Sequence, residues 1–385
     1  MMASAAASTL IAVTLLVTLA FGVFGCDWGG TGSPTSAPTS TTVTAGGNGD
    51  SATTVSGGDG LVSPAAEVAR VLGPSVVNIK CTGQASVPDY FQIPGQQQFS
   101  TEWEGSGVIY SADGKIITNN HVVTGGSTTN ATDIEVTLAT GEKLKATVVG
   151  TDPLTDLAVI KIDAGFNLPA ATFATDLPVL GEYVVALGSP DGFENSVNLG
   201  IVSGLDRTVE VQDTAGSTLY TDLIQTDAGI SSGNSGGALA NVKGQVVGIP
   251  SVAVQSVQVE NIGFAIPSAQ VVRVADEIIA TGKATHAFMG VSTRTVDESL
   301  QKQFGLTRSS GLLVASLAAD GPAAKAGIKQ GDIIIKVDGK EMTESNDLLA
   351  AIRDKKPGDE VEVTIDRSGD TKVITVTLQE RPSDY

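Results

Sequence analysis

The sequence predicts a mainly β protein, in which antiparallel barrels or sandwiches are followed by a smaller α+β domain. Between residues 75 and 267, short apolar runs alternate with Gly, Asn, Asp and Pro, a pattern typical of many short strands joined by turns. An amphipathic helix is expected over Ser268–Thr281, with Gly282 just past its end. Residues 287–380 then alternate strand-like and helical segments, which indicates a second, smaller unit.

Composition narrows the classes of function. The chain has 385 residues, long enough for two or three domains. It carries 23 Lys and Arg residues against 42 Asp and Glu residues, a net charge of −19. Such an acidic surface repels a phosphate backbone, which excludes nucleic acid as the main partner. Two cysteines, Cys26 and Cys81, give no disulfide framework and no metal motif, and Cys81 is expected to be a small buried residue.

Residues 1–28 are predicted to be a signal or anchor segment. Residues 3–25 carry no charge and have an apolar centre. The run VFGC that ends at Cys26 resembles a bacterial lipobox, in which the cysteine is acylated, although Phe24 is bulkier than that motif usually has. A lipoprotein, an uncleaved anchor and a cleaved secretion signal all remain open. Each of them places the rest of the chain outside the cytoplasm.

A linker and a first folded domain follow. Residues 29–60 are almost wholly Gly, Ser, Thr, Ala and Pro, and they cannot bury enough apolar surface to offset the entropy of ordering. They are therefore predicted to be disordered. The first domain is expected over residues 61–282. It begins with a helix over Pro64–Leu72, which Ser63 caps and Gly73 ends.

The strands expected in this domain share apolar residues bounded by turn residues. They are residues 76–80, 107–111, 116–119, 134–137, 145–150, 158–162, 183–187, 198–203, 223–225, 237–240, 246–249 and 262–265. A hairpin turn is expected at Asp113-Gly114. Residues 84–101, which include three consecutive glutamines, are expected to form a mobile polar loop.

The second domain is expected over residues 287–380. Its strands are predicted at 311–316, 332–337, 360–366 and 371–378, after a first strand near its start. Its two helices are predicted at 322–326 and 345–354.

A serine, a histidine and an aspartate carry the predicted chemistry. Ser235 lies in a loop of glycines, whose backbone freedom lets the amides of Gly233 and Ser235 turn toward one point beside the serine hydroxyl. A serine hydroxyl needs a base to take its proton, and His121, expected at the end of a strand, is one of only two histidines. Asp156 precedes an apolar strand and could hold the imidazole. The order His, Asp, Ser is that of a chymotrypsin-like double barrel.

Five motifs make the resemblance specific. They are 105–109 (GSGVI), 118–123 (TNNHVV), 156–162 (DLAVIKI), 233–237 (GNSGG) and 263–267 (GFAIP). Together they resemble the HtrA/Deg family of trypsin-like, extracytoplasmic quality-control serine proteases. The resemblance implies a chymotrypsin-like double β-barrel protease domain over residues 61–282.

The resemblance also implies roles for single residues. His121 would be the general base, Asp156 its orienting partner and Ser235 the nucleophile. The amides of Gly233 and Ser235, with Asn234 between them, would form the oxyanion hole. Its flank Ser231-Ser232 stands where the family often has Asn-Pro, and activity is expected to be switched there.

Two further features follow from the same resemblance. Ile230, Ala253 and Val254 fall where the family lines its substrate pocket, and three aliphatic side chains would suit Val, Ala or Leu before the scissile bond. Arg207, at the start of a polar loop over 207–221, matches the arginine that relays regulatory signals toward the oxyanion loop.

The second domain resembles a PDZ module. Its expected carboxylate-binding loop is Phe288, Met289, Gly290 and Val291, whose amides would capture a peptide C-terminus. The segments 311–314 (GLLV), 321–328 (GPAAKAGI) and 331–334 (GDII) support the match. A role for Phe288 and Met289 in core packing alone remains open. His286 is expected to be a solvated linker residue.

The resulting prediction is an extracytoplasmic serine endopeptidase, tethered to a membrane, that degrades unfolded or misassembled proteins. It needs no metal and no cofactor, and its PDZ domain would bind peptide C-termini for regulation or delivery. The family assembles as trimers, so a homotrimer or a multiple of it is expected. The alternative is a chaperone or peptide sensor with latent protease activity.

Overall fold

The computed structural model describes residues 63–85, 99–125, 131–189, 196–213, 216–231, 233–251, 262–353 and 355–382. Residues 60–385 form one compact unit. The predicted signal or anchor segment with Cys26, and the predicted linker 29–60, lie outside the described residues. Among the helices that are described, none is long and apolar enough to cross a membrane.

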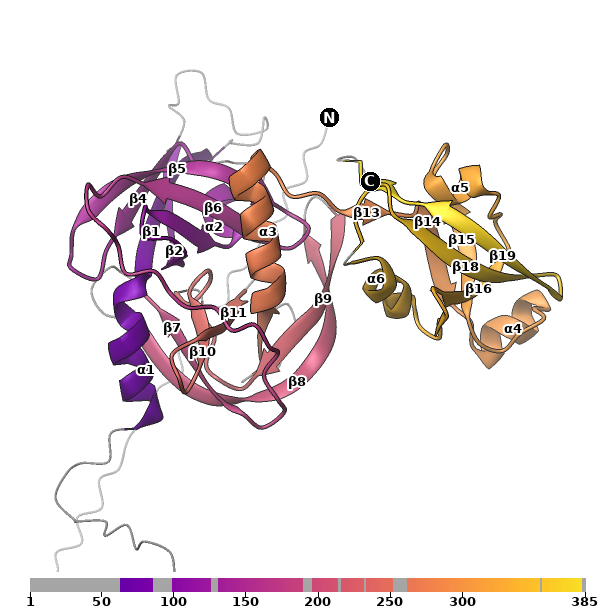
Figure 1. Ribbon diagram of the computed structural model, residues 1–385, viewed down its shortest axis with the longest axis horizontal. Coiled ribbons are helices and arrows are strands. Elements are labelled where there is room, and N and C mark those ends of the chain that lie inside the picture. The colour runs from indigo at the N-terminus through magenta and orange to yellow at the C-terminus, as the bar shows by residue number, and fades with distance from the viewer. Residues whose placement is uncertain are drawn as a thin grey trace, which may run out of the picture. The chain divides into compact units, whose positions relative to one another are not determined.

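The N-terminal part of the unit is a closed six-stranded barrel in the order β1-β2-β3-β6-β5-β4 (Figure 1). All neighbouring strands pair antiparallel. The strands are β1 (Val76–Ala85), β2 (Phe99–Ile109), β3 (Lys115–Thr118), β4 (Asp133–Thr137), β5 (Lys143–Asp152) and β6 (Leu157–Ile162). Ile79, Ile116 and Ile160 belong to one cluster of this barrel and are fully buried.

The middle part of the unit is another closed barrel, in the order β10-β11-β12-β9-β8-β7. Its strands are β7 (Tyr183–Gly188), β8 (Ser196–Asp213), β9 (Gly216–Thr226), β10 (Ala238–Asn241), β11 (Val246–Pro250) and β12 (Gly263–Pro267). The prediction of antiparallel barrels with a chymotrypsin-like double-barrel arrangement is confirmed.

Two helices flank the barrels, and both have the bounds that the sequence predicts. In α1 (Pro64–Leu72) the Ser63 hydroxyl accepts the Ala66 amide at 3.2 Å. Helix α3 (Ser268–Thr281) ends at Gly282, which has the left-handed conformation. Helix α3 packs on β5 and β6 of the first barrel and on β11 and β12 of the second, so it holds the two together.

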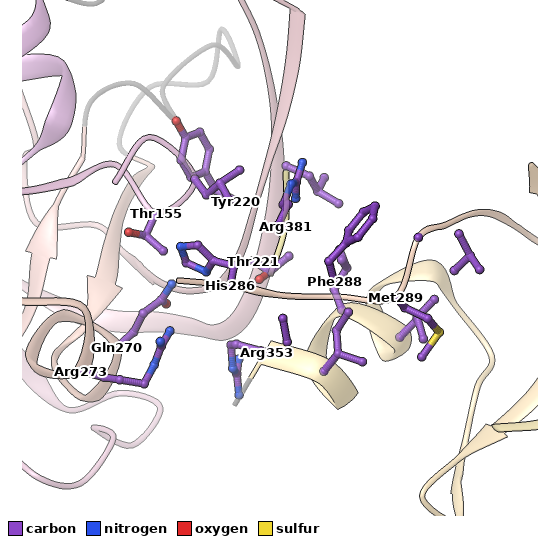
Figure 2. Close-up of a pocket in the computed structure, with 18 of the residues that line it drawn as sticks. Thr155, Tyr220, Thr221, Gln270, Arg273, His286, Phe288, Met289, Arg353 and Arg381 are labelled. Carbon is purple, nitrogen blue, oxygen red and sulfur yellow. The ribbon is translucent and has the colours of Figure 1, made fainter. Parts of the chain in front are cut away.

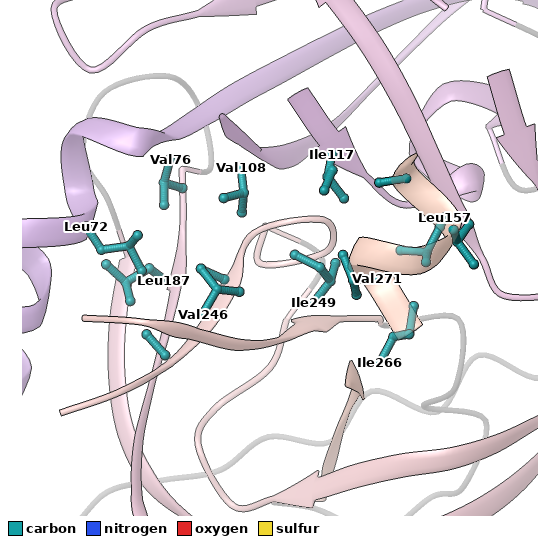
Figure 3. Close-up of a cluster of buried hydrophobic side chains, with 14 of the residues drawn as sticks. Leu72, Val76, Val108, Ile117, Leu157, Leu187, Val246, Ile249, Ile266 and Val271 are labelled. Carbon is teal, nitrogen blue, oxygen red and sulfur yellow. The ribbon is translucent and has the colours of Figure 1, made fainter. Parts of the chain in front are cut away.

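An apolar core lies between the barrels (Figure 3). The first barrel contributes Val108 and Ile117, the second contributes Leu187 and Ile249, and α3 contributes Val271, all at most 1% exposed. Burying one such side chain contributes about 1.5–3 kcal/mol. The core therefore fixes the relative position of the two barrels, between which the site described below is located.

The C-terminal part contains a six-stranded sheet with the path β14-β15-β16-β18-β19, to which β17 adds beside β16. Its strands are β14 (Val291–Thr295), β15 (Leu312–Leu317), β16 (Ile333–Val337), β17 (Lys340–Glu341), β18 (Glu360–Arg367) and β19 (Asp370–Thr377), and a separate pair joins β13 (Ala287–Phe288) to β20 (Gln379–Glu380). The expected helices are present as α5 (Pro322–Ala326) and α6 (Ser345–Arg353).

The structure differs from the prediction at three places. The predicted polar loop 207–221 is, in its described residues, the end of β8 and most of β9, which form one long twisted hairpin. The ends of the predicted loop 84–101 belong to β1 and β2, and residues 86–98 lie outside the described residues. A helix, α4 (Glu298–Phe304), was not predicted, because only Leu300 of its residues is buried and the apolar signal is weak.

Candidate active site

His121 lies on α2 (Asn120–Thr124), a short helix after β3, and not at the end of a strand as expected. Asn119 precedes the helix in an extended conformation, without a capping hydrogen bond from its side chain, and Gly125 ends it in the left-handed conformation, at φ 66°. Within this turn the His121 amide donates to Asp156 Oδ1 at 3.0 Å. The backbone and the ring of His121 are therefore held by the same carboxylate.

Asp156 closes the turn between β5 and β6, in a left-handed conformation at φ 55° that few residues other than glycine adopt. Its carbonyl accepts the Asn120 amide at 3.1 Å and Asn119 Nδ2 at 2.9 Å, and these bonds hold the strained turn. The side chain is 2% exposed, and its Oδ2 lies 2.8 Å from His121 Nδ1. A buried carboxylate in this position selects the imidazole tautomer that leaves Nε2 able to accept a proton.

Ser251, directly after β11, completes the surroundings of this carboxylate. Its hydroxyl donates to Asp156 Oδ2 at 2.6 Å, and the residue is 1% exposed. Sequence reasoning did not single out Ser251. The only local signal was a small hydroxyl residue at the end of an apolar strand, and its partner lies 95 residues away in the sequence.

The contact with Asp156 changes the proton affinity of His121. Burial of the imidazole opposes its charging, but the Asp156 charge and the hydrogen bond to it outweigh burial and raise the pKa of His121. The His121 side chain is still 24% exposed, so it is open to an incoming group. An imidazole with these properties can act as a general base near neutral pH.

The loop of Ser235 is anchored to the first barrel at Ser106. The Ser106 amide donates to the Ser235 carbonyl at 2.8 Å, and the Ser106 carbonyl accepts the Thr118 hydroxyl at 2.7 Å. Thr118 ends the strand that leads into the helix of His121. Ser235 and His121 are therefore attached to the same pair of strands, although the chain separates them widely.

Gly236 allows this approach. Its φ is +77°, and a Cβ there would lie 2.3 Å from the Ser106 carbonyl oxygen and 2.4 Å from Thr118 Oγ1. No side chain fits at that distance, so the glycine after the serine is required by the space available as well as by the backbone conformation.

The candidate oxyanion hole is held from two sides. The Gly233 carbonyl accepts the Ser106 hydroxyl at 2.6 Å, while the Gly233 amide donates to no acceptor in the described part of the chain. Asn234 is fully buried, and its Nδ2 donates to the Gly229 carbonyl at 2.8 Å. Such an amide beside the serine can stabilise a developing negative charge.

Of the residues predicted to line the substrate pocket, the structure describes Ile230. Ile230 is 9% exposed and contacts Gly263, where a Cβ would lie 2.4 Å from its side chain. Ala253, Val254, Ser232 and Cys26 lie outside the described residues.

Arg207 is exposed on β8, within the hairpin that replaces the predicted loop. Its Nε donates to Gln225 Oε1 at 3.0 Å, and it pairs in register with Leu223 on β9. Its side chain is therefore fixed on the same hairpin, one strand away from the segment that leads to the Ser235 loop.

The predicted carboxylate-binding loop borders a cavity of about 380 Å³ (Figure 2). Phe288 ends β13, Gly290 has φ +78°, and Val291 begins β14. Met289 is 2% exposed and belongs to the core of the C-terminal sheet, so it also packs. Its carbonyl accepts the Ala323 amide at 2.9 Å, which fixes the loop against α5.

His286 is not the solvated linker residue that was expected. Its side chain is 20% exposed, and Nε2 lies 2.9 Å from Oδ2 of Asp152, which is 4% exposed. The same carboxylate accepts the Thr155 hydroxyl, next to Asp156. The expectation was wrong because the partner lies 134 residues earlier in the chain.

Two six-stranded barrels with a His–Asp pair beside a glycine-flanked serine loop define a trypsin-like peptidase. Comparison with family models agrees: a trypsin-like peptidase domain matches residues 105–249, and a PDZ domain matches residues 287–378. The chain belongs to the HtrA family of serine proteases.

Two bacterial proteins are similar to this chain over most of its length. The "Serine protease Do-like HtrB" of Bacillus subtilis is 38% identical over 327 residues, which cover 81% of this chain and 70% of the relative. A "Probable periplasmic serine endoprotease DegP-like" of Ectopseudomonas mendocina is 39% identical over 303 residues, or 78% of this chain and 61% of the relative. The chain thus spans about three fifths of the length of the DegP-like relatives.

Solved structures show the same likeness. The structure described as "HtrA-type protease AlgW with decapeptide" is 34% identical, with a TM-score of 0.67, and the match covers 83% of this chain and 99% of that one. A serine endoprotease from Yersinia pestis is 32% identical, with a TM-score of 0.60 and coverage of 83% and 98%.

Proposed function

We propose that this protein is an extracytoplasmic serine endopeptidase that cleaves unfolded or misassembled proteins. The observation that carries the proposal is the buried Asp156 carboxylate, 2.8 Å from His121 Nδ1, beside a Ser235 loop anchored to the same strands. Ser235 attacks the peptide carbonyl while His121 Nε2 takes the hydroxyl proton. His121 then gives that proton to the leaving amine, and water hydrolyses the acyl-enzyme by the same route.

Backbone amides stabilise the tetrahedral intermediate. The amides of Gly233 and Ser235 donate to the oxyanion, in a loop that Ser106 and the buried Asn234 hold in place. Preorganised amides of this kind typically contribute about 10²–10³ in rate each. Ile230, Ala253 and Val254 supply an aliphatic pocket that favours Val, Ala or Leu before the scissile bond.

The sequence and the relatives support a proposal for the location and partners of this protein. Relatives of this chain are named periplasmic, and residues 3–25 are uncharged, which supports export with a tether through Cys26 or an uncleaved anchor.

The domain limits we propose are 61–282 for the protease and 287–380 for the PDZ domain. The PDZ domain binds peptide C-termini through 288–291, Arg207 transmits regulation, and the assembly is a trimer or a multiple of it.

Degradation of unfolded casein tests the proposal. The full chain in detergent should cleave casein, and Ser235→Ala should remove this activity, whereas Ser309→Ala, an exposed serine of the C-terminal domain, should keep it. An alkyl fluorophosphonate should form an Oγ–P bond at Ser235, with fluoride leaving, and mass spectrometry of the peptide locates the adduct. If the full chain and both variants prevent the aggregation of casein and none of them cleaves it, the chaperone alternative is favoured.

A further inference from the structure

The cavity beside the predicted carboxylate-binding loop has one apolar wall. Met289, with Leu348 and Ile352 of α6, lines it next to the start of β14 (Figure 2). The opposite wall comes from β9 of the second barrel, with Tyr220, and from α3, with Arg273. A peptide strand laid beside β14 would therefore have apolar contacts on one side and barrel residues on the other.

The charge of this cavity differs from that of the rest of the chain. Its described lining includes Arg273, Arg353 and Arg381 but no Asp or Glu. The chain as a whole has 42 acidic residues against 23 basic ones. A cationic cavity in an acidic protein attracts carboxylates and repels basic side chains.

The three arginines come from three separate elements. Arg273 is half-buried on α3 and forms no ion pair with any described residue. Arg353, at the end of α6, pairs with Asp222 of β9. The Arg381 amide donates to the His286 carbonyl at 2.9 Å, which holds that residue beside β13. Folding thus brings to one cavity three cations that the sequence places 28 or more residues apart.

We propose that this cavity selects peptide C-termini that carry acidic side chains close to the terminal carboxylate. The proposal rests on peptide capture at 288–291 and names the class of peptide. A single terminal carboxylate carries one negative charge, and backbone amides of the loop already receive it. Arg273, which lacks an acidic partner among the described residues, is then left for a side-chain carboxylate of the ligand. Partial burial strengthens such a pair, because water screens it less.

The terminal carboxylate and a side-chain carboxylate offer the same chemistry, so the test separates them. Fluorescein-labelled Gly-Ser-Glu-Glu-Ala-Val and Gly-Ser-Gln-Gln-Ala-Val are titrated as free acids and as C-terminal amides against the full chain carrying Ser235→Ala, which prevents cleavage. Fluorescence anisotropy gives each Kd. We expect the Glu peptide to bind about tenfold more tightly than the Gln peptide, a difference of about 1.4 kcal/mol.

Substitution of the arginines tests whether they cause the preference for the Glu peptide over the Gln peptide. Arg273→Gln should reduce the Glu-over-Gln ratio toward about threefold, and Arg273→Gln with Arg381→Gln should bring it near one. Arg70→Gln is the matched control, because it removes one positive charge from the exposed face of α1 without touching the cavity. Thermal unfolding of each variant checks that the fold is retained.

The outcomes are distinguishable. Equal affinity for the Glu and Gln acids, or a preference that persists in the double variant, overturns the acidic selectivity while peptide capture stands. Failure of every peptide to bind, or equal binding of acids and amides, contradicts carboxylate capture at 288–291 itself. Loss of casein cleavage in Ser235→Ala is independent of all these results and concerns only the proposed protease activity.

Discussion

Asp156 holds His121 at two points: Oδ1 accepts the His121 backbone amide at 3.0 Å, and Oδ2 lies 2.8 Å from ring Nδ1. One buried carboxylate therefore sets both the position of the helix turn and the orientation of the imidazole. Ser251 occupies a further site on the same Oδ2, at 2.6 Å. The geometry of the candidate base depends on this carboxylate more than on any other group described.

Asp156→Asn should lower kcat by about 10⁴, because an amide favours the wrong imidazole tautomer while keeping the shape of the site. Casein or peptide cleavage measures the loss. The matched control is Asp276→Asn, an exposed carboxylate on α3 that accepts the Tyr110 hydroxyl. A variant at Asp156 that kept more than a tenth of the activity would contradict the assigned role.

The pH dependence of kcat/KM should report His121. Burial opposes its charging, yet the Asp156 charge and hydrogen bond raise the pKa above the ordinary value of about 6.5. A general base must be neutral, so activity should fall as pH drops through this raised pKa. Asp156→Asn should move the acid limb to lower pH. An acid limb of the wild type below about 6.5 would argue against the pairing.

The free energy of unfolding should also depend on His121, but its contribution should decrease as pH rises, whereas activity increases. The folded-state pKa of His121 lies above its unfolded value, so the charged pair with Asp156 stabilises the fold fully below the unfolded pKa. This contribution is lost as pH rises through the folded pKa. Denaturant unfolding of Ser235→Ala against Ser235→Ala with His121→Gln, followed across pH 5–9, isolates the contribution; the difference should shrink as pH increases.

Ser251→Ala should reduce kcat by roughly tenfold, with KM little changed. It removes the hydrogen bond to Asp156 Oδ2, and a hydrogen bond to a charged group contributes about 1.5–3 kcal/mol. Ser309→Ala again serves as the control. Unchanged kcat in a correctly folded Ser251→Ala protein would show that Asp156 keeps its position without that hydroxyl.

Gly236→Ala should abolish measurable cleavage and lower the Tm, because the new Cβ would meet the Ser106 carbonyl oxygen at 2.3 Å. Gly165→Ala is a matched control: its φ of +71° imposes a similar backbone strain, but a Cβ there meets nothing within 4 Å. Strain of this kind alone costs about 1–2 kcal/mol. Similar losses in the two variants would show that backbone conformation, and not close approach, matters at Gly236.

Local signals allowed much of the fold to be predicted. The bounds of α1 and α3 are as expected, because Ser63, Pro64 and Gly282 act within a few residues of the helix ends that they define. The hairpin of β8 and β9 was taken for a loop in part, although Val209 and Val211 alternate with Thr208 and Glu210 and pack, partly buried, against the core.

Contacts between distant residues were not predictable in the same way. Ser251 and His286 were missed because their partners, Asp156 and Asp152, lie 95 and 134 residues away in the chain. Nothing adjacent to either residue distinguishes it from a polar residue exposed to solvent. Only the packing of the two barrels and of α3 brings each of them to its carboxylate.

The sequence by itself determined the class of fold, the identity of the His, Asp and Ser candidates, and the need for glycine around Ser235. These conclusions rest on residue chemistry and spacing that any fold must accommodate. Only the tertiary structure decided how the three are held: the left-handed turn of Asp156, the hydroxyl of Ser251 and the anchoring of the Ser235 loop at Ser106. The physical reason is that closing two barrels around one apolar core joins strands that are far apart in the chain, and the hydrogen bonds at their junction exist only after that closure.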